Sequence, residues 1–336
     1  MMETPQAAAA TDLAATPATP SASPWLRFTA RRLGQLLISA LVLVTASFGI
    51  IHLVPGDPVR AALGLNASQL LVNTRRAQLG LNDPLWLQYL HYLKDLFTGH
   101  FGTSIDSGLP VSQEIGQRLP ATLELAGYSF LVAVVVAIPV GLALGVVTRN
   151  GRRRGTELAA TTVSVVAGAI PAFVLSSWLI YLFGVTLRWL PVADRSGFTS
   201  YILPIAAMAV GPIAVLVRIL RIEVLAALRA DYVRTARAKR LPDWRVYLLH
   251  VLPNALTATL TIGGLLLSGM VAGTVLVENV FAWPGLGQTI VASIVAKDYP
   301  VVQGIVLVYG TGVLLVNLVV DVALALLDPR STIRES

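Results

Sequence analysis

The sequence predicts an all-α membrane protein with six transmembrane helices. Of its 336 residues, 55% are hydrophobic and only 13% are charged, and the mean hydropathy is +0.72. A soluble chain of this length could not bury so much apolar surface around its cores. Six apolar runs are long enough to cross a bilayer, which takes roughly 20 residues. We expect the six spans at residues 33–54, 121–147, 159–187, 201–217, 255–277 and 301–327.

The basic residues predict the orientation of these spans. If the N-terminus is cytoplasmic, 17 of the 25 Lys and Arg residues fall on cytoplasmic segments. Cytoplasmic loops carry such an excess in membrane proteins. We therefore expect both termini and the basic segment 218–253 in the cytoplasm, and a long first external loop at residues 55–120.

The chain divides into four parts. Residues 1–24 are rich in Ala, Pro, Thr and Ser and predict a disordered tail without the features of a signal peptide. Residues 25–120 hold the first transmembrane helix and the external loop, residues 121–328 the other five helices, and residues 329–336 a cytoplasmic tail. Within the external loop, Asp57 in a PGDP turn suits a helix cap, and the leucine spacing of residues 84–97 predicts an amphipathic helix.

Several kinds of chemistry are absent from the sequence. It has no cysteine, and its four histidines (His52, His91, His100, His250) lack metal-ligand spacing. No lysine follows a glycine, so the chain has no Walker A phosphate loop. We expect a chain that is not an enzyme and holds no cofactor or metal. The net charge of +7 follows from the orientation rather than from binding nucleic acid.

Three acidic residues lie in or beside the spans. Glu124 follows Pro120 closely, so it either sits in a first helical turn or lines a pathway. Asp321 lies late in the sixth span, where we expect it to cap or pair locally. Glu223 is expected to pair with Arg218 and Arg221 at the membrane interface.

The densest basic sequence runs DYVRTARAKRLPDWRVYLLHVLPNAL from Asp231. Asp231 can cap a short helix at residues 232–240, and Pro242 with Asp243 suits the start of a second helix. Composition alone also fits a solvated loop that binds lipid phosphates.

This segment resembles the EAA-type loop of bacterial ABC importer permeases of the oligopeptide/dipeptide/nickel family, first permease subunit type. Other motifs follow in the family's order, which makes the match specific from about residue 27 onward. They are RRLGQLLISALVLVTASFGIIHLVPGDPV, LGLNDPLWLQYLHYLKDLFTGHFGTS, RLPATLELA, VFAWPGLGQ and LLDPR. Two positions depart from the family: Arg240 replaces the usual glycine, and Arg234 stands where the wider motif has an acidic residue.

The resemblance implies a type I ABC importer permease fold in the bacterial cytoplasmic membrane. It implies one half of a pathway for short peptides, with a second permease subunit, two ATPase subunits or domains that bind ATP and Mg, an external solute-binding protein, and lipid as partners. Import of nickel or another small solute, or a self-sufficient secondary transporter, are the alternatives. The implied ATPase-coupling residues are Asp231, Tyr232, Arg234, Thr235, Ala236, Arg237, Ala238, Lys239 and Arg240.

The turn after the fifth span is the second candidate site. By resemblance it forms part of an outer gate or a receptor-docking surface, and the alternative is a plain turn. Its residues are Glu278, Trp283, Pro284, Gly285 and Gly287.

Overall fold

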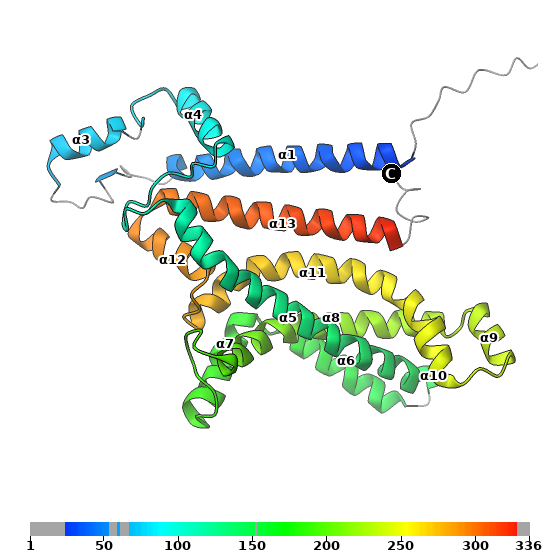
Figure 1. The fold of residues 1–336 in the computed structure, drawn as a ribbon. Coiled ribbons are helices and arrows are strands. Elements are labelled where there is room, and N and C mark those ends of the chain that lie inside the picture. Colours follow the sequence, from blue (N-terminus) through cyan, green and yellow to red (C-terminus); the bar gives the residue numbers. More distant parts are fainter. Residues whose placement is uncertain (1–23, 54–58, 61–66, 79, 152, 328–336) are drawn as a thin grey trace, which may run out of the picture.

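The computed structural model describes residues 24–53, 59–60, 67–78, 80–151 and 153–327 (Figure 1). This part of the chain forms helices without a named strand, and one isolated bridge joins Thr103 to Pro110. The expected tails lie outside the described residues, except that Pro24 begins the first helix. The turn expected to hold Asp57 also lies outside them.

Among the described residues, five helical stretches are long and apolar enough to cross a membrane. They contain α1 (Pro24–Leu53), α5 (Val111–Thr148), α8 (Phe198–Ala227), α11 (Leu252–Val280) and α13 (Tyr299–Leu327). The stretch with α11 begins at Asp243, because α10 (Asp243–Arg245) and the π-helix η3 (Val246–Val251) run into it. A bent pair adds a sixth candidate span if its two arms are taken together. Helix α6 (Arg154–Ala169) meets α7 (Ala172–Leu179) at 94°, and the π-helix η2 (Ile180–Thr186) continues α7.

Prolines explain where the helices differ from expectation. The single helix expected at 159–187 is wrong, because Ile170 is extended with ψ 119° and Pro171 precedes α7. Proline lacks an N–H and disfavours the helical conformation of the residue before it. By contrast, Pro120 lies inside α5, which begins at Val111 rather than at residue 121.

The remaining helices are α3 (Gln69–Gln78), α4 (Leu85–Phe97), η1 (Arg149–Gly151), α9 (Asp231–Ala238) and α12 (Leu286–Ala296). The helix expected at 84–97 is confirmed as α4. In Figure 1, α3, α4 and α12 lie at one end of the bundle. The other end holds α9, α10, the start of α1 and the end of α13. The segments expected in the cytoplasm thus share one end, and the side of the membrane that this end faces stays a prediction.

Small residues allow the central helices to pack closely. Helix α8 packs against α5 more extensively than any other described pair of elements, and α11 packs on both. A Cβ added at Gly141 would lie 2.9 Å from Leu220 Cβ, and one at Gly145 would lie 2.8 Å from Val224 Cβ. Small residues at such spacing let helix backbones approach in membranes, where no hydrophobic effect drives association.

Helix α1 lies at the side of the bundle against α13 (Figure 1). Gln303 Nε2 donates to the Ser47 carbonyl at 3.1 Å, and Ser47 Oγ donates to the Gln303 carbonyl at 3.2 Å. From α4, Tyr92 OH donates to Ser47 Oγ at 3.3 Å, and burial raises the pKa of Tyr92 above its usual value. Helix α4 is therefore fixed across the α1–α13 pair.

Candidate functional site

The coupling segment (residues 228–246) is built around α9. Ala230 occupies the N-cap position and makes no side-chain cap bond. Asp231 lies in the first turn, where its carboxylate pairs with Arg234 at 3.2 Å. The expectation that Asp231 caps this helix is wrong. Its charge still favours the first turn, since the helix dipole is positive there.

Helix α9 is attached to the bundle by two side chains. In residues 231–240, only Val233 (0% exposed) and Ala236 (5%) are buried. Three residues apart on a helix, they share one face. They belong to one apolar cluster with Leu220, Val224, Ala227, Val246, Val251 and Ala255. Ala236, expected among the coupling residues, therefore faces its own chain. Val233 was missed, although its spacing from Ala236 could have identified it.

The other eight residues of this stretch are exposed to solvent. They are Asp231, Tyr232, Arg234, Thr235, Arg237, Ala238, Lys239 and Arg240. Four of the eight are basic and one is acidic, so the exposed face of α9 is positively charged. A partner that binds this face needs acidic or hydrogen-bond-accepting groups.

Arg240 ends α9 in a Schellman motif. Its N–H donates to the Arg237 carbonyl at 2.9 Å, and the Leu241 N–H donates to the Ala236 carbonyl at 3.3 Å. The motif places Arg240 at φ 55°, the left-handed region that glycine favours. The turn expected of the family's glycine is thus present with arginine in its place. Pro242 does not break the helix; it occupies the N-cap position of α10.

Polar contacts tie this end of the bundle together. Arg221 pairs with Glu157 of α6 at 2.7 Å, and its Nε donates to Thr148 Oγ1 at 3.1 Å. The ion pair expected between Arg221 and Glu223 is wrong, because Arg221 binds Glu157 instead. Arg149 donates to the hydroxyl of Tyr247. Helices α5, α6 and α8 therefore form a joined base under the coupling segment.

The outer turn (residues 278–287) is built around a buried carboxylate. Glu278, at the end of α11, is 0% exposed. Its Oε2 accepts the backbone N–H of Gly287 at 2.6 Å and that of Gln288 at 3.3 Å. Both donors lie in the first turn of α12, where N–H groups lack helical partners and attract anions. Glu278 therefore fixes the start of α12 against the end of α11.

The two glycines allow this close approach. A Cβ added at Gly285 would lie 2.6 Å from Glu278 Cδ and 2.6 Å from Thr122 Oγ1. One added at Gly287 would lie 2.5 Å from Val275 Cα. Neither glycine has a left-handed backbone. Glycine is required at both positions because a Cβ has no room there, and not because of the backbone conformation.

Trp283 joins the turn to α5. The side chain is 0% exposed, and its Nε1 donates to the Ala121 carbonyl at 3.0 Å. Glu278, Gly285 and Gly287 are also buried, and Pro284 is half-buried. These five side chains therefore offer little contact surface of their own, and their role in an outer gate or a receptor-docking surface stays a prediction.

Glu124 takes part in a network beside this turn. It lies well inside α5, so its expected place in a first helical turn is wrong. Arg195 Nη2 contacts both carboxylate oxygens, at 2.7 and 2.6 Å. Tyr201 OH donates to Glu124 Oε2 at 2.8 Å and accepts from Arg195 Nε at 2.8 Å. Asp321, which was expected to cap or pair locally, pairs instead with Arg32 of α1 at 2.9 Å.

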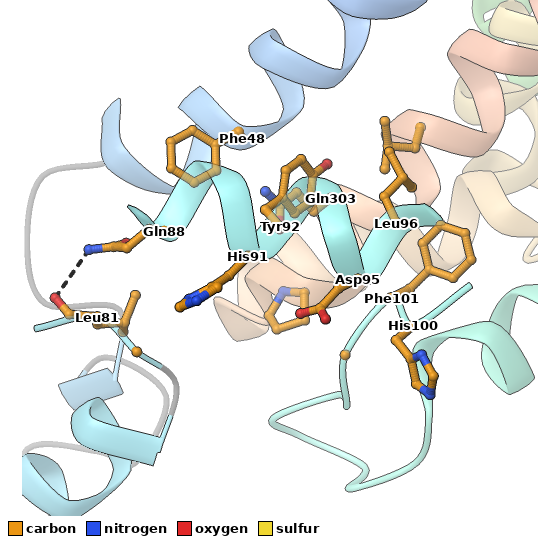
Figure 2. Close-up of a pocket in the computed structure, with 15 residues that line it drawn as sticks. Phe48, Leu81, Gln88, His91, Tyr92, Asp95, Leu96, His100, Phe101 and Gln303 are labelled. Atoms are coloured by element: carbon orange, nitrogen blue, oxygen red, sulfur yellow. Dashed lines mark hydrogen bonds between the residues drawn. The ribbon is translucent and has the colours of Figure 1, made fainter. Parts of the chain in front are cut away.

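A cavity of about 220 Å³ lies between α4, α13 and the loop after α4 (Figure 2). Its lining includes His91, Asp95, His100 and Gln303. Gln88 of α4 donates its side-chain N–H to the Leu81 carbonyl at 3.4 Å (Figure 2). The histidines lack metal-ligand spacing in the sequence, and the described residues contain no group of three side chains that could hold a metal ion.

Comparison with known proteins gives one family. Residues 121–333 match the family described as binding-protein-dependent transport system inner membrane component, and residues 25–126 match its N-terminal companion. The glutathione transport system permease protein GsiC of Salmonella choleraesuis (strain SC-B67) is 37% identical over 304 residues, covering 90% of this chain and 98% of the relative. GsiC of Escherichia coli (strain K12) is 36% identical with the same coverage.

A solved structure shares the fold. The inward-facing MetNI methionine ABC transporter aligns with a TM-score of 0.54 and 18% identity, over 64% of this chain and 97% of that chain. The expected type I importer permease fold is thereby confirmed. The chain belongs to the binding-protein-dependent transport system inner membrane components, as a multi-pass ABC importer permease of the oligopeptide/dipeptide family in the bacterial inner membrane.

Proposed function

We propose that this permease forms one half of a translocation pathway for short peptides. ATPase subunits bind the exposed face of α9, and ATP hydrolysis changes the conformation of the permease through this contact. In this proposal the chain catalyses no covalent chemistry. Two ATPase subunits or domains bind ATP and Mg, a second permease completes the pathway, and an external solute-binding protein delivers the substrate.

The observation that carries the coupling role is the two-sided construction of α9. Val233 and Ala236 attach the helix to the bundle, while its other side chains face outward. A helix that served only to connect α8 to α11 would not need an exposed basic face on a rigid base. The absence of a Walker A loop also requires that the nucleotide bind elsewhere.

The peptide substrate is supported by the relatives. The GsiC proteins are named as glutathione transport permeases, and glutathione is a tripeptide. Their 98% coverage extends the similarity over the outer helices as well as the coupling segment. We therefore infer a short peptide or a peptide-like conjugate as the substrate class.

The test of coupling is co-purification of the ATPase with a variant permease. Arg237→Glu reverses a charge on the exposed face of α9, so we expect at least a tenfold loss of ATPase binding and of uptake. Arg237→Lys keeps the charge and should retain most of both. Arg153→Glu is the matched control, because Arg153 is exposed near the start of α6 on the same base.

Thermal unfolding in detergent should be unchanged for Arg237→Glu, since this side chain is exposed and does not belong to the buried cluster. Normal ATPase co-purification together with normal uptake would overturn the coupling role of α9. Equal losses in Arg237→Glu and Arg153→Glu would show that only the net charge of this end matters.

A further inference from the structure

A second feature of the chain lies between α5 and α8, at the end opposite α9. There an apolar groove of about 740 Å³ opens on the surface. Its lining comes from α5 and α8 and includes Tyr128, Leu131, Phe198 and Tyr201. Leu131 is 57% exposed and Phe198 is 83% exposed, so no described segment covers the groove.

The charged network of Glu124, Arg195 and Tyr201 meets this groove at Tyr201. Glu124 precedes Tyr128 by four residues on α5, which places both on one helix face. Tyr201 belongs to both features: its ring lines the groove, and its hydroxyl binds Glu124 and Arg195. The apolar lining of the groove therefore adjoins the carboxylate of Glu124 and the guanidinium of Arg195.

The ion pair is accessible enough to exchange partners. The side chains of Arg195 and Glu124 are 34% and 32% exposed. A pair this exposed contributes little stability of its own, so replacing one partner by an external charge costs little. The planar guanidinium of Arg195 can donate two N–H groups to the carboxylate of a ligand. At present both carboxylate oxygens of Glu124 contact a single nitrogen, Arg195 Nη2.

We propose that Glu124 and Arg195 form a binding subsite for the charged termini of a short peptide, whose side chains lie in the apolar groove. The α-carboxylate of the peptide binds Arg195, and its α-ammonium group binds Glu124. Tyr201 keeps its hydroxyl between the two charges. This subsite rests on the proposed peptide-import function and adds to it the feature by which the permease itself recognises free termini.

Ligand binding to the purified permease–ATPase complex, without the receptor, tests this assignment. The probes are the dipeptide alanyl-phenylalanine, its C-terminal amide and its N-acetyl form. Arg195→Gln should weaken binding of the free dipeptide at least tenfold relative to wild type and leave binding of the amide unchanged. Glu124→Gln should weaken the free dipeptide similarly and leave the N-acetyl form unchanged.

The matched control is Arg188→Gln, which removes an exposed arginine from the same connection before α8. It should leave the binding of all three probes unchanged. If Arg195→Gln weakens all three probes equally, or none, the pair is a structural contact and the subsite is overturned. The thermal midpoint of each variant separates loss of recognition from loss of folding.

Two other outcomes have distinct meanings. Wild-type complex that takes up no peptide with any loaded receptor contradicts the proposed function itself. Wild-type peptide uptake with terminal preferences unaltered by either variant contradicts only the subsite. If the groove instead holds a helix of the second permease, Leu131→Gln will release that subunit during purification, and the subsite is again overturned.

Discussion

The coupling segment and the outer turn share a backbone motif and differ in what surrounds it. Arg240 ends α9 at φ 55°, and Ala282 ends α11 at φ 48°; in both, two N–H groups bond back to the preceding turn. Around Arg240, most side chains face solvent, whereas Trp283 and Glu278 beside Ala282 are fully buried. The same turn thus presents a surface at one end of the bundle and closes a packed core at the other.

The two regions should therefore respond differently to substitution. The outer turn should lose stability when a buried atom changes, because packed interiors tolerate neither cavities nor added atoms. The coupling segment should lose partner binding when its surface changes, with folding intact. The four predictions below test this contrast in order of decreasing effect.

Trp283→Ala should produce the largest effect. It leaves a cavity in the core shared by α5, α8 and α11 and removes the bond to the Ala121 carbonyl. We expect a loss of about 3–5 kcal/mol in the free energy of unfolding, measured by SDS titration in micelles. Trp189→Ala is the control, because Trp189 is 70% exposed and should cost much less. Similar losses in the two variants would remove the contrast.

Gly287→Ala should destabilise the outer turn by about 1–3 kcal/mol through overpacking. Its Cβ would press on the α11 backbone at Val275, which cannot rotate away. Gly273→Ala on α11 is the control, since a Cβ there meets nothing within 4 Å. The same SDS titration compares them, and an unchanged Gly287→Ala midpoint would show that the turn is not closely packed.

Ala236→Glu and Arg237→Glu, on neighbouring positions of α9, should behave differently. Ala236→Glu forces a carboxylate into the apolar cluster, so we expect α9 to detach, with about tenfold faster proteolysis within residues 228–242. This corresponds to about 1.4 kcal/mol of local stability. Arg237→Glu should leave the proteolysis rate unchanged. Equal rates for both variants would mean that α9 is not held by its buried face.

Arg240→Gly should give the smallest effect and the opposite sign. Glycine occupies the left-handed region without the Cβ clash, so we expect a gain of up to about 1 kcal/mol in the local stability of α9. Arg234→Gly, inside the helix, should instead cost about 1 kcal/mol. The proteolysis rate of the coupling segment reports both. Faster cleavage of Arg240→Gly would show that the arginine side chain stabilises the turn.

The sequence predicted the positions of the spans better than the bends within them. Hydropathy located the five long spans and the two arms of the bent pair, because each is apolar along its length. It could not distinguish Pro120, which α5 accommodates, from Pro171, which bends the third span by 94°. Neighbouring helices decide whether a proline in a membrane helix is tolerated, and sequence periodicity does not report them.

The candidate sites were predicted unevenly for a related reason. Motifs located α9 and the outer turn, but not which side of each is buried. The ion pair of Arg195 and Glu124 joins residues 71 apart, and Arg221 pairs with Glu157 of α6 rather than with Glu223 on its own helix. Such pairs depend on helix packing, which local sequence does not report. The expected pairing of Arg221 with Glu223 was wrong for this reason.

The most direct test of the coupling role is protection of single cysteines by the ATPase. The chain has no cysteine of its own, so every signal comes from the one introduced. In inside-out vesicles, an impermeant maleimide should label Arg237→Cys when the ATPase is absent and at least tenfold more slowly when it is bound. Val233→Cys, whose side chain is fully buried against the bundle, should label slowly in both cases. Rapid labelling of Arg237→Cys with the ATPase bound would contradict the coupling role of α9.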